Sequence, residues 1–313
     1  MSRRRLVVTE AALIGTALAV VLGTLVARLC LAAPSAPTTG IGIRQAPPAD
    51  SEACELSASG KPLAETLILS YYGNPYARDM GVVGELPPEA LVEKLKAHAE
   101  RYDSLNGPRT VQPALHLVYA TAQTKPGPEG LHLTYVGEET LQEYLDLACE
   151  NGLLVFLDIQ IGRSDVETEL AKILPYLEGP HVHVALDPEY AVAEGEIPRE
   201  SLGSLDAADV NAAQALLQDF VEEHDLPDKI LVVHQFTPDM LTRPELIADY
   251  PRVKFVIDMD GIGPPDMKRV MYHRLTASAE YAGIKLFIRL DQPSHLMSEE
   301  EVLELKPDVI IYQ

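Results

Sequence analysis

The chain has 313 residues, of which 47% are hydrophobic, and it carries a formal net charge of -22. So acidic a chain repels a phosphate backbone, which argues against a nucleic-acid-binding protein. Its three cysteines are too few for a fold held together by a framework of disulfide bonds. Cys54 and Cys149 can form one bond that ties an N-terminal linker to the domain, or they can remain free thiols, and the sequence leaves both open.

Residues 1–33 have the pattern of an export signal. Arg3, Arg4 and Arg5 precede a long apolar run that extends from Ala11. The run is long enough to cross a bilayer if it stays uncleaved, whereas the small residues near its end would suit a signal peptidase. We favour the anchor. Because the basic residues keep their end in the cytoplasm, we expect the rest of the chain to be extracytoplasmic, either membrane-anchored or secreted.

A linker is predicted to follow the leader. Residues 34–63 are rich in Pro, Ser and Gly and show neither the helical nor the strand period. Residues 64–313 remain, and roughly 250 residues suit one large α/β domain better than two small ones.

Eight short apolar runs follow one another along residues 64–313, and most end in polar residues. In chain order they are ETLILSYYGNP, VQPALHLVYAT, LLVFLDIQIG, HVHVALDPEY, KILVVHQF, VKFVIDMDGIG, IKLFIRLD and PDVIIYQ. Helical candidates lie between them, including PPEALVEKLKAHAERY, GEETLQEYLDLACENG, DVETELAKILPYLE and DAADVNAAQALLQDFVEEH. Apolar strands that alternate with helices predict parallel strands covered on both faces.

Eight such units in a domain of this size predict an α/β fold of the (β/α)8 TIM-barrel type. The alternative, an open doubly wound sheet, normally has fewer strands and a glycine-rich first turn. The last run ends at Gln313, so we expect the final helix of such a barrel to be truncated. We expect the linker or the leader side of the chain to cover that part of the barrel.

The polar ends of the runs predict a functional pocket. In a parallel barrel, the carboxyl ends of all strands meet at one mouth, and residues two apart on a strand point the same way. Asp187 and Glu189, at the end of the fourth run, are therefore expected to share a face. The other strand-end candidates are Tyr71, Tyr72, Asn74, Asp158, Gln160, His234, Gln235, Asp258, Asp260, Arg289, Asp291 and Tyr312. The simpler alternative is that these ends are polar because they emerge into loops and cap helices.

Carboxylates after the fourth strand and after the sixth or seventh strand of an exported barrel resemble the glycosidase-type TIM barrels. The resemblance spans the barrel domain and implies that Glu189 is the proton donor, with Asp258 or Asp260 as its partner. Asp187 and Asp158 would then orient and tune it. Many of those families carry Asn-Glu where this chain has the DPE of run four. The segments YYGNP and ALDPEY also resemble bacterial exported proteins, a likeness that implies no activity.

Cleavage of a glycosidic bond needs one carboxyl group that is protonated through a raised pKa and one that is ionised. Clustered acids supply this, since like charges close together cannot all ionise. Tyr71, Tyr72 and Tyr190 can stack on sugar rings, and Arg289 and His234 can hold hydroxyl or acidic groups of a carbohydrate or another small ligand. The chain has no tryptophan, which argues against a polysaccharide enzyme. This hypothesis requires no cofactor.

Two other functions remain open. The same carboxylates, together with His234, form a hard-ligand set that Mg²⁺, Ca²⁺ or Mn²⁺ would accept, which describes a hydrolase dependent on a divalent cation. The sequence has no HExxH, Walker or GxSxG motif. His116, inside the second run, is more typical of a core residue than of a ligand. The third function is binding of an envelope component without catalysis, in which the acids serve structure alone.

Overall fold

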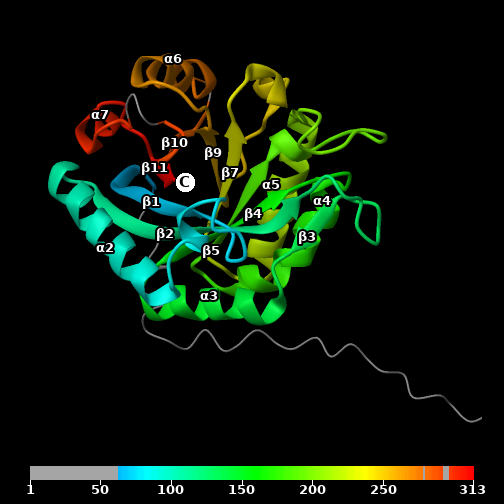
Figure 1. Ribbon diagram of the computed structural model, residues 1–313, viewed down its shortest axis with the longest axis horizontal. Helices are drawn as coiled ribbons and strands as arrows, with labels where there is room; N and C mark the ends of the chain where they lie inside the picture. The colour runs from blue at the N-terminus through cyan, green and yellow to red at the C-terminus, as the bar shows by residue number, and fades with distance from the viewer. Residues whose placement is uncertain (1–62, 278, 292–295) are drawn as a thin grey trace, which may run out of the picture. The chain divides into compact units, whose positions relative to one another are not determined.

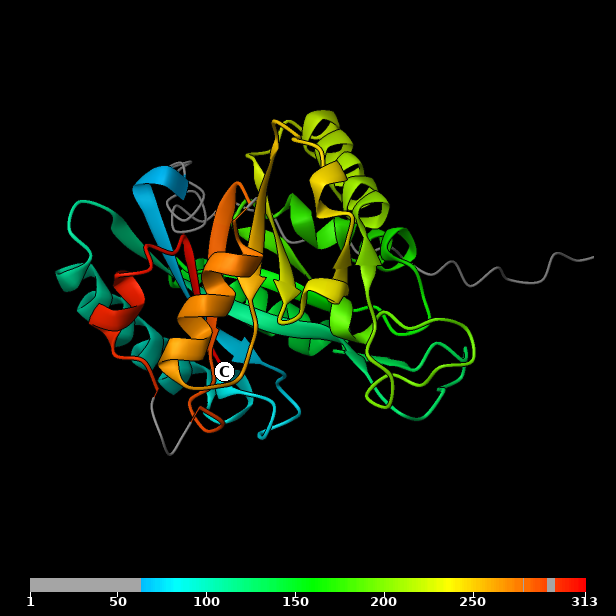
Figure 2. The same cartoon turned by 90° about the horizontal axis from the view of Figure 1, so that it is seen from above.

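Parallel strands form a closed barrel surrounded by helices (Figures 1 and 2). The computed structural model describes residues 63–277, 279–291 and 296–313. The barrel strands are β1 (Thr66–Gly73), β2 (Thr110–Ala122), β4 (Leu154–Gln160), β5 (Val182–Asp187), β7 (Lys229–Gln235), β9 (Val253–Met259), β10 (Tyr281–Leu286) and β11 (Val309–Tyr312). Strand β1 pairs in parallel with both β11 and β2, which closes the barrel. The predicted (β/α)8 fold is confirmed.

Helices follow most of the strands and cover the outside of the barrel (Figure 1). They are α2 (Pro88–Leu105), α3 (Glu138–Glu150), α4 (Val166–Ile173), α5 (Ala207–Glu223), α6 (Pro265–Leu275) and α7 (Glu299–Leu303). The third predicted helix is shorter than expected, because α4 gives way at Leu174 to the 3-10 helix η3 (Leu174–Glu178). Pro175 lacks an N–H and cannot continue the α-helical hydrogen bonds.

Several short elements complete the described chain. Strand β3 (Leu133–Tyr135) pairs antiparallel with the end of β2, and β6 (Leu205–Asp206) pairs with β8 (Leu241–Thr242). The remaining 3-10 helices are η1 (Leu63–Glu65), η2 (Val82–Gly84), η4 (Pro188–Tyr190), η5 (Pro238–Met240) and η6 (Pro244–Leu246). None was predicted, since so few residues show no apolar period.

Each barrel strand packs one face against helices and the other against the barrel interior. Leu69 and Leu117 belong to the large outer cluster, whereas Val118, Phe156 and Val232 belong to a smaller cluster inside the barrel. Because successive side chains alternate, every second residue of a strand faces inward. This alternation decides which strand-end residues reach the site.

Strand β10 begins and ends earlier than the sequence predicts. The apolar run IKLFIRLD was expected to end at Arg289 and Asp291, but the strand covers Tyr281–Leu286. Gly283 lies so close to β9 that a Cβ atom there would come within 2.8 Å of an Asp258 carboxylate oxygen. The strand therefore begins in a segment without a strong apolar signal, and Arg289 and Asp291 lie in the loop that follows it.

The predictions for the leader, for residues 34–62 of the linker and for Cys54 lie outside the described residues, and Leu63, predicted as the last linker residue, begins η1. Cys149, on α3, is disulfide-bonded. Among the helices of the described ranges, none is long and apolar enough to cross a membrane.

Lys229, at the start of β7, is a buried base whose lowered pKa can be tested through the pH dependence of stability. Its Nζ donates hydrogen bonds to the carbonyls of Gly179 and Val182, at 2.8 and 3.0 Å. Burial lowers the pKa of Lys229 from 10.5 to about 7. Between these two values the unfolded chain binds more protons than the folded one, so this lysine makes the free energy of unfolding rise with pH.

We therefore expect the wild type to gain stability relative to Lys229→Met between about pH 7 and about pH 9.5, by up to roughly 1.4 kcal/mol per pH unit. Urea unfolding of both proteins at several pH values measures the difference. Parallel stability profiles would show that Lys229 keeps its ordinary pKa in the folded chain.

Candidate active site

Ionisable side chains from most of the barrel strands meet in the carboxyl half of the barrel. They are Tyr72, His116, Asp158, Asp187, His234, Asp258, Asp260 and Lys285, and all are buried. His116, Asp158 and His234 stand two residues after the inward-facing Ala114, Phe156 and Val232, so they point into the barrel as well. The predicted convergence of strand ends at one mouth is therefore seen for these residues.

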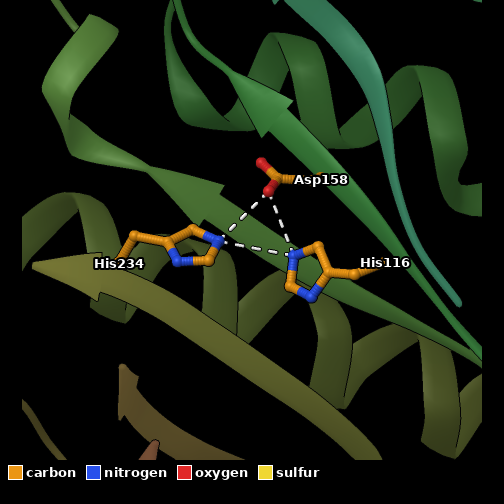
Figure 3. A group of neighbouring side chains, drawn as sticks. All are labelled: His116, Asp158 and His234. Atoms are coloured by element: carbon orange, nitrogen blue, oxygen red, sulfur yellow. Dashed lines mark hydrogen bonds and ion pairs between the residues drawn. The ribbon is translucent and has the colours of Figure 1, made fainter. Parts of the chain in front are cut away.

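The deepest part of this group is a triangle of polar atoms (Figure 3). The Oδ2 atom of Asp158 lies 3.0 Å from His116 Nε2 and 3.1 Å from His234 Nε2, and the two Nε2 atoms lie 3.3 Å apart. The other ring nitrogen of His234, Nδ1, lies 2.9 Å from Asp258 Oδ2. All four side chains are fully buried.

The carboxylates around His234 set its charge. Burial opposes a charge on the ring, but the carboxylate of Asp158 outweighs it and raises the pKa of His234 well above its ordinary value. For Asp158, burial likewise favours the neutral acid, yet His234 and His116 hold the pKa of Asp158 well below its usual range. Burial lowers the pKa of His116 to about 4, so this ring is neutral at pH 7.

An ion pair lies nearer the mouth. Lys285 Nζ lies 3.1 Å from Asp260 Oδ2 and 3.7 Å from the centroid of the Tyr72 ring. Burial opposes the charge of Lys285, but the Asp260 carboxylate raises the pKa of the amine above its ordinary value. Asp260 retains 9% exposure, whereas Asp258 retains none. Of the two acids on β9 and its end, Asp260 is therefore the one nearer to solvent.

The end of β5 differs from the expectation. Asp187 ends the strand and Glu189 lies in η4, because Pro188 begins a turn there. The two acids therefore do not share a strand face. Instead, the Glu189 N–H donates a hydrogen bond to Asp187 Oδ1 at 3.3 Å, which holds the turn. Burial raises the pKa of Asp187 well above its ordinary value, and the half-buried Glu189 has a pKa raised by burial and by the charge of Asp260.

Two predicted tyrosines lie on the opposite side of their strands from the site. The Tyr71 hydroxyl lies 3.0 Å from His98 Nδ1, and the Tyr312 hydroxyl lies 2.7 Å from that of Tyr102, both between the barrel and α2. The sequence placed Tyr71 and Tyr72 together at the mouth, but neighbouring residues on a strand face opposite ways. Only Tyr72 faces inward.

Three other candidates lie in loops or on the outer face. Arg289 is exposed and pairs with Glu85, and Asp291 pairs with the buried Lys268 at 3.0 Å. Gln235, one residue after the inward-facing His234, donates hydrogen bonds to backbone carbonyls of the loop after β7. These three side chains are not brought into the group described above.

The remaining candidates lie near the ends of the strands at the mouth. The Asn74 side-chain amide donates to the Val118 carbonyl at 3.0 Å, and Gln160 Oε1 accepts from the Ala122 N–H at 2.7 Å. Tyr190 is half-buried on η4, where burial and the charge of Asp187 raise the pKa of its hydroxyl.

Sequence reasoning missed His116 and Lys285. His116 was interpreted as a core residue, and it is one, but its ring also contacts Asp158 and His234. Lys285 stands inside an apolar run, and this was the available signal: a lone charge at an inward position needs a partner inside the barrel.

No protein-family model and no curated protein matches the chain. Among solved structures it is similar to oxaloacetate acetylhydrolase, with 12% identity, coverage of 83% of this chain and 79% of that one, and a TM-score of 0.46. It is similar to 2,3-dimethylmalate lyase with 12% identity, coverage of 83% of this chain and 80% of that one, and a TM-score of 0.46. It is also similar to the spore cortex-lytic enzyme SleL of Bacillus megaterium QM B1551, with 10% identity, coverage of 79% of this chain and 70% of that one, and a TM-score of 0.42. A likeness this distant identifies no reaction, so the function is argued from the site.

Proposed function

We propose that the chain is a glycoside hydrolase in which Glu189 donates the proton and Asp260 is its carboxylate partner. The observation that supports this is the difference in electrostatic surroundings between the two acids at the mouth. Burial raises the pKa of both acids, and the charge of Asp260 raises that of Glu189 further, whereas the Lys285 ammonium, 3.1 Å from Asp260, favours the ionised form of Asp260 and offsets part of its rise. The ammonium beside Asp260 therefore distinguishes the two acids, and glycosidic cleavage requires one acid that keeps its proton and one that ionises.

The two acids would divide the reaction as follows. Glu189 is half-buried, so a leaving-group oxygen can reach it, and its raised pKa keeps a proton available for transfer. Asp260 either activates a water molecule or attacks the sugar directly. The Lys285 ammonium holds the Asp260 charge, and Asp187 fixes the turn that carries Glu189 through the 3.3 Å hydrogen bond.

Asp258 is not proposed as the partner acid. It is fully buried, and its Oδ2 lies 2.9 Å from His234 Nδ1. Asp258 therefore serves to orient His234, and the choice that the sequence left open between Asp258 and Asp260 goes to Asp260.

The test of this function is turnover by the purified full chain. Para-nitrophenyl glycosides and envelope glycans are incubated with the wild type, with Glu189→Gln/Asp260→Asn and with Glu194→Gln. Glu194 is an exposed acid in the loop after η4, which makes it a matched control. We expect hydrolysis of at least one substrate by the wild type and by the control, and none by the double variant.

Two results would contradict the proposal. Equal turnover by the double variant would show that the hydrolysis comes from another site or a contaminant. Binding of a glycan without hydrolysis would favour a binding protein with the same acidic mouth.

A further inference from the structure

The triangle formed by His116, Asp158 and His234 has the dimensions of a cation site. Its three atoms, two imidazole nitrogens and one carboxylate oxygen, are separated by 3.0 to 3.3 Å (Figure 3). Ligands that bind one Zn²⁺ ion do so at about 2.0–2.2 Å, which places them roughly 3–3.5 Å from one another. The three atoms come from β2, β4 and β7, and each side chain is fully buried.

Hydrogen atoms alone do not satisfy this triangle. Each of the two Nε2 atoms carries at most one proton and an ionised Asp158 carries none, so hydrogen bonds can form along at most two of the three edges. If both rings donate to Asp158, their N–H groups converge on one oxygen, and the two nitrogen atoms lie 3.3 Å apart with no hydrogen bond between them. If only one ring donates, the lone pair of the other faces the carboxylate oxygen at 3.0 or 3.1 Å. A cation at the centre removes this conflict, since all three atoms then present lone pairs to it.

A second carboxylate oxygen is free to join. Asp158 Oδ1 is buried and has no hydrogen-bond partner among the described residues. Buried oxygens of ionised carboxylates are rarely left without partners, because the desolvation cost is large. A cation bound by both oxygens of Asp158 accounts for this atom too.

Asp258 supplies the support that metal-binding histidines usually have. Its Oδ2 accepts from the Nδ1 side of His234 at 2.9 Å, which leaves the Nε2 lone pair of His234 directed at the triangle. A histidine ligand that donates its other N–H to a carboxylate is the common arrangement in metal sites, and it fixes the ring orientation.

We propose that His116, Asp158 and His234 bind a divalent cation of the Zn²⁺ class. Imidazole nitrogens suit Zn²⁺ better than Mg²⁺ or Ca²⁺, which prefer oxygen ligands. Because the three side chains are fully buried, the ion would not touch the substrate. It would join β2, β4 and β7 below the acid pair and replace the proton of His234. This site does not depend on glycosidase activity, and its test uses no substrate.

The test measures metal binding to the full chain after removal of metals with a chelator. Calorimetry is expected to show one Zn²⁺ bound per chain, weaker binding of Mn²⁺ and none of Mg²⁺, with a melting temperature that rises on Zn²⁺ addition. His116→Gln and Asp158→Asn should abolish binding at this stoichiometry. Asp258→Asn should weaken it by roughly 10–100-fold through the loss of ring orientation.

His183→Gln is the matched control. His183 is another buried histidine of the barrel interior, but its Nδ1 accepts a hydrogen bond from the Ile230 N–H instead of contacting the triangle. Zn²⁺ affinity should be unchanged in this variant. Failure of the stripped wild type to bind Zn²⁺, or equal affinity in the wild type and His116→Gln, would overturn the proposal.

A measurement on the wild type alone guards against variants that do not fold. The X-ray absorption spectrum at the zinc edge should show the outer-shell scattering of two imidazole rings. A Zn²⁺ ion bound without imidazole ligands would overturn the site even if calorimetry showed tight binding.

Discussion

Replacement of Glu189 by Gln is expected to lower kcat by roughly 10²–10⁴-fold on the glycoside that the chain hydrolyses, the range for loss of one general acid. Gln has the same shape but carries no transferable proton. The hydrogen bond from the backbone N–H of residue 189 to Asp187 Oδ1 remains available, so the turn should persist. Steady-state kinetics of the wild type, Glu189→Gln and the control Glu194→Gln measure the effect.

The pH dependence of the wild-type activity should also show that Glu189 acts as the acid. Glu189 must be protonated to act as an acid, so activity should fall as the pH rises through its pKa. Because burial and Asp260 raise that pKa, the fall should occur above the ordinary range of a glutamate. This fall of activity with rising pH should be absent from the residual activity of Glu189→Gln. If it persisted in that variant, another residue would be the proton donor.

Asp158→Ala is expected to cost roughly 3–5 kcal/mol of the free energy of unfolding, the range for removal of one partner from a buried charge pair. Asp158 is fully buried and lies within 3.1 Å of both His116 and His234. Without it, the charge on His234 loses the carboxylate that most favours it. Urea unfolding in the presence of a chelator measures the loss free of any metal contribution.

Asp206→Ala is the control for this substitution. Asp206 pairs with Arg243 through hydrogen bonds at the surface, where solvent screens the charges. Because its side chain also caps α5 by accepting a hydrogen bond from the Ala208 N–H, its removal should lower the free energy of unfolding, but by less than the loss of Asp158. If Asp158→Ala cost no more than Asp206→Ala, the buried network would not contribute to stability as described.

The barrel was readable from the sequence because each parallel strand, buried on both faces, leaves a nearly continuous apolar run. The same runs predicted Asp158, Asp187, His234, Asp258 and Asp260 near one another, since the carboxyl ends of parallel strands share one mouth. The direction in which a single side chain points was harder to predict. Tyr71 and Tyr72 were expected together, although alternation sends them to opposite sides.

Other features depend on how the strands are staggered, which the sequence does not display. The start of β10 at Tyr281 follows from the close packing of Gly283 on Asp258. That register turns Lys285 inward, although it was not predicted as a site residue, and leaves the predicted Arg289 in a loop. The contacts of His116 with Asp158 and His234 likewise arise from the relative heights of β2, β4 and β7 in the barrel, where β5 lies between β4 and β7.

The assignment of Glu189 as the proton donor is tested most directly by varying the leaving group of the substrate. A dinitrophenyl group departs without protonation, whereas an alkyl alcohol or a second sugar requires it. The account predicts that Glu189→Gln retains most of the wild-type kcat/KM on the dinitrophenyl glycoside and loses it on the unactivated one. An equal loss on both substrates would contradict the role of Glu189 as the acid of a glycoside hydrolase.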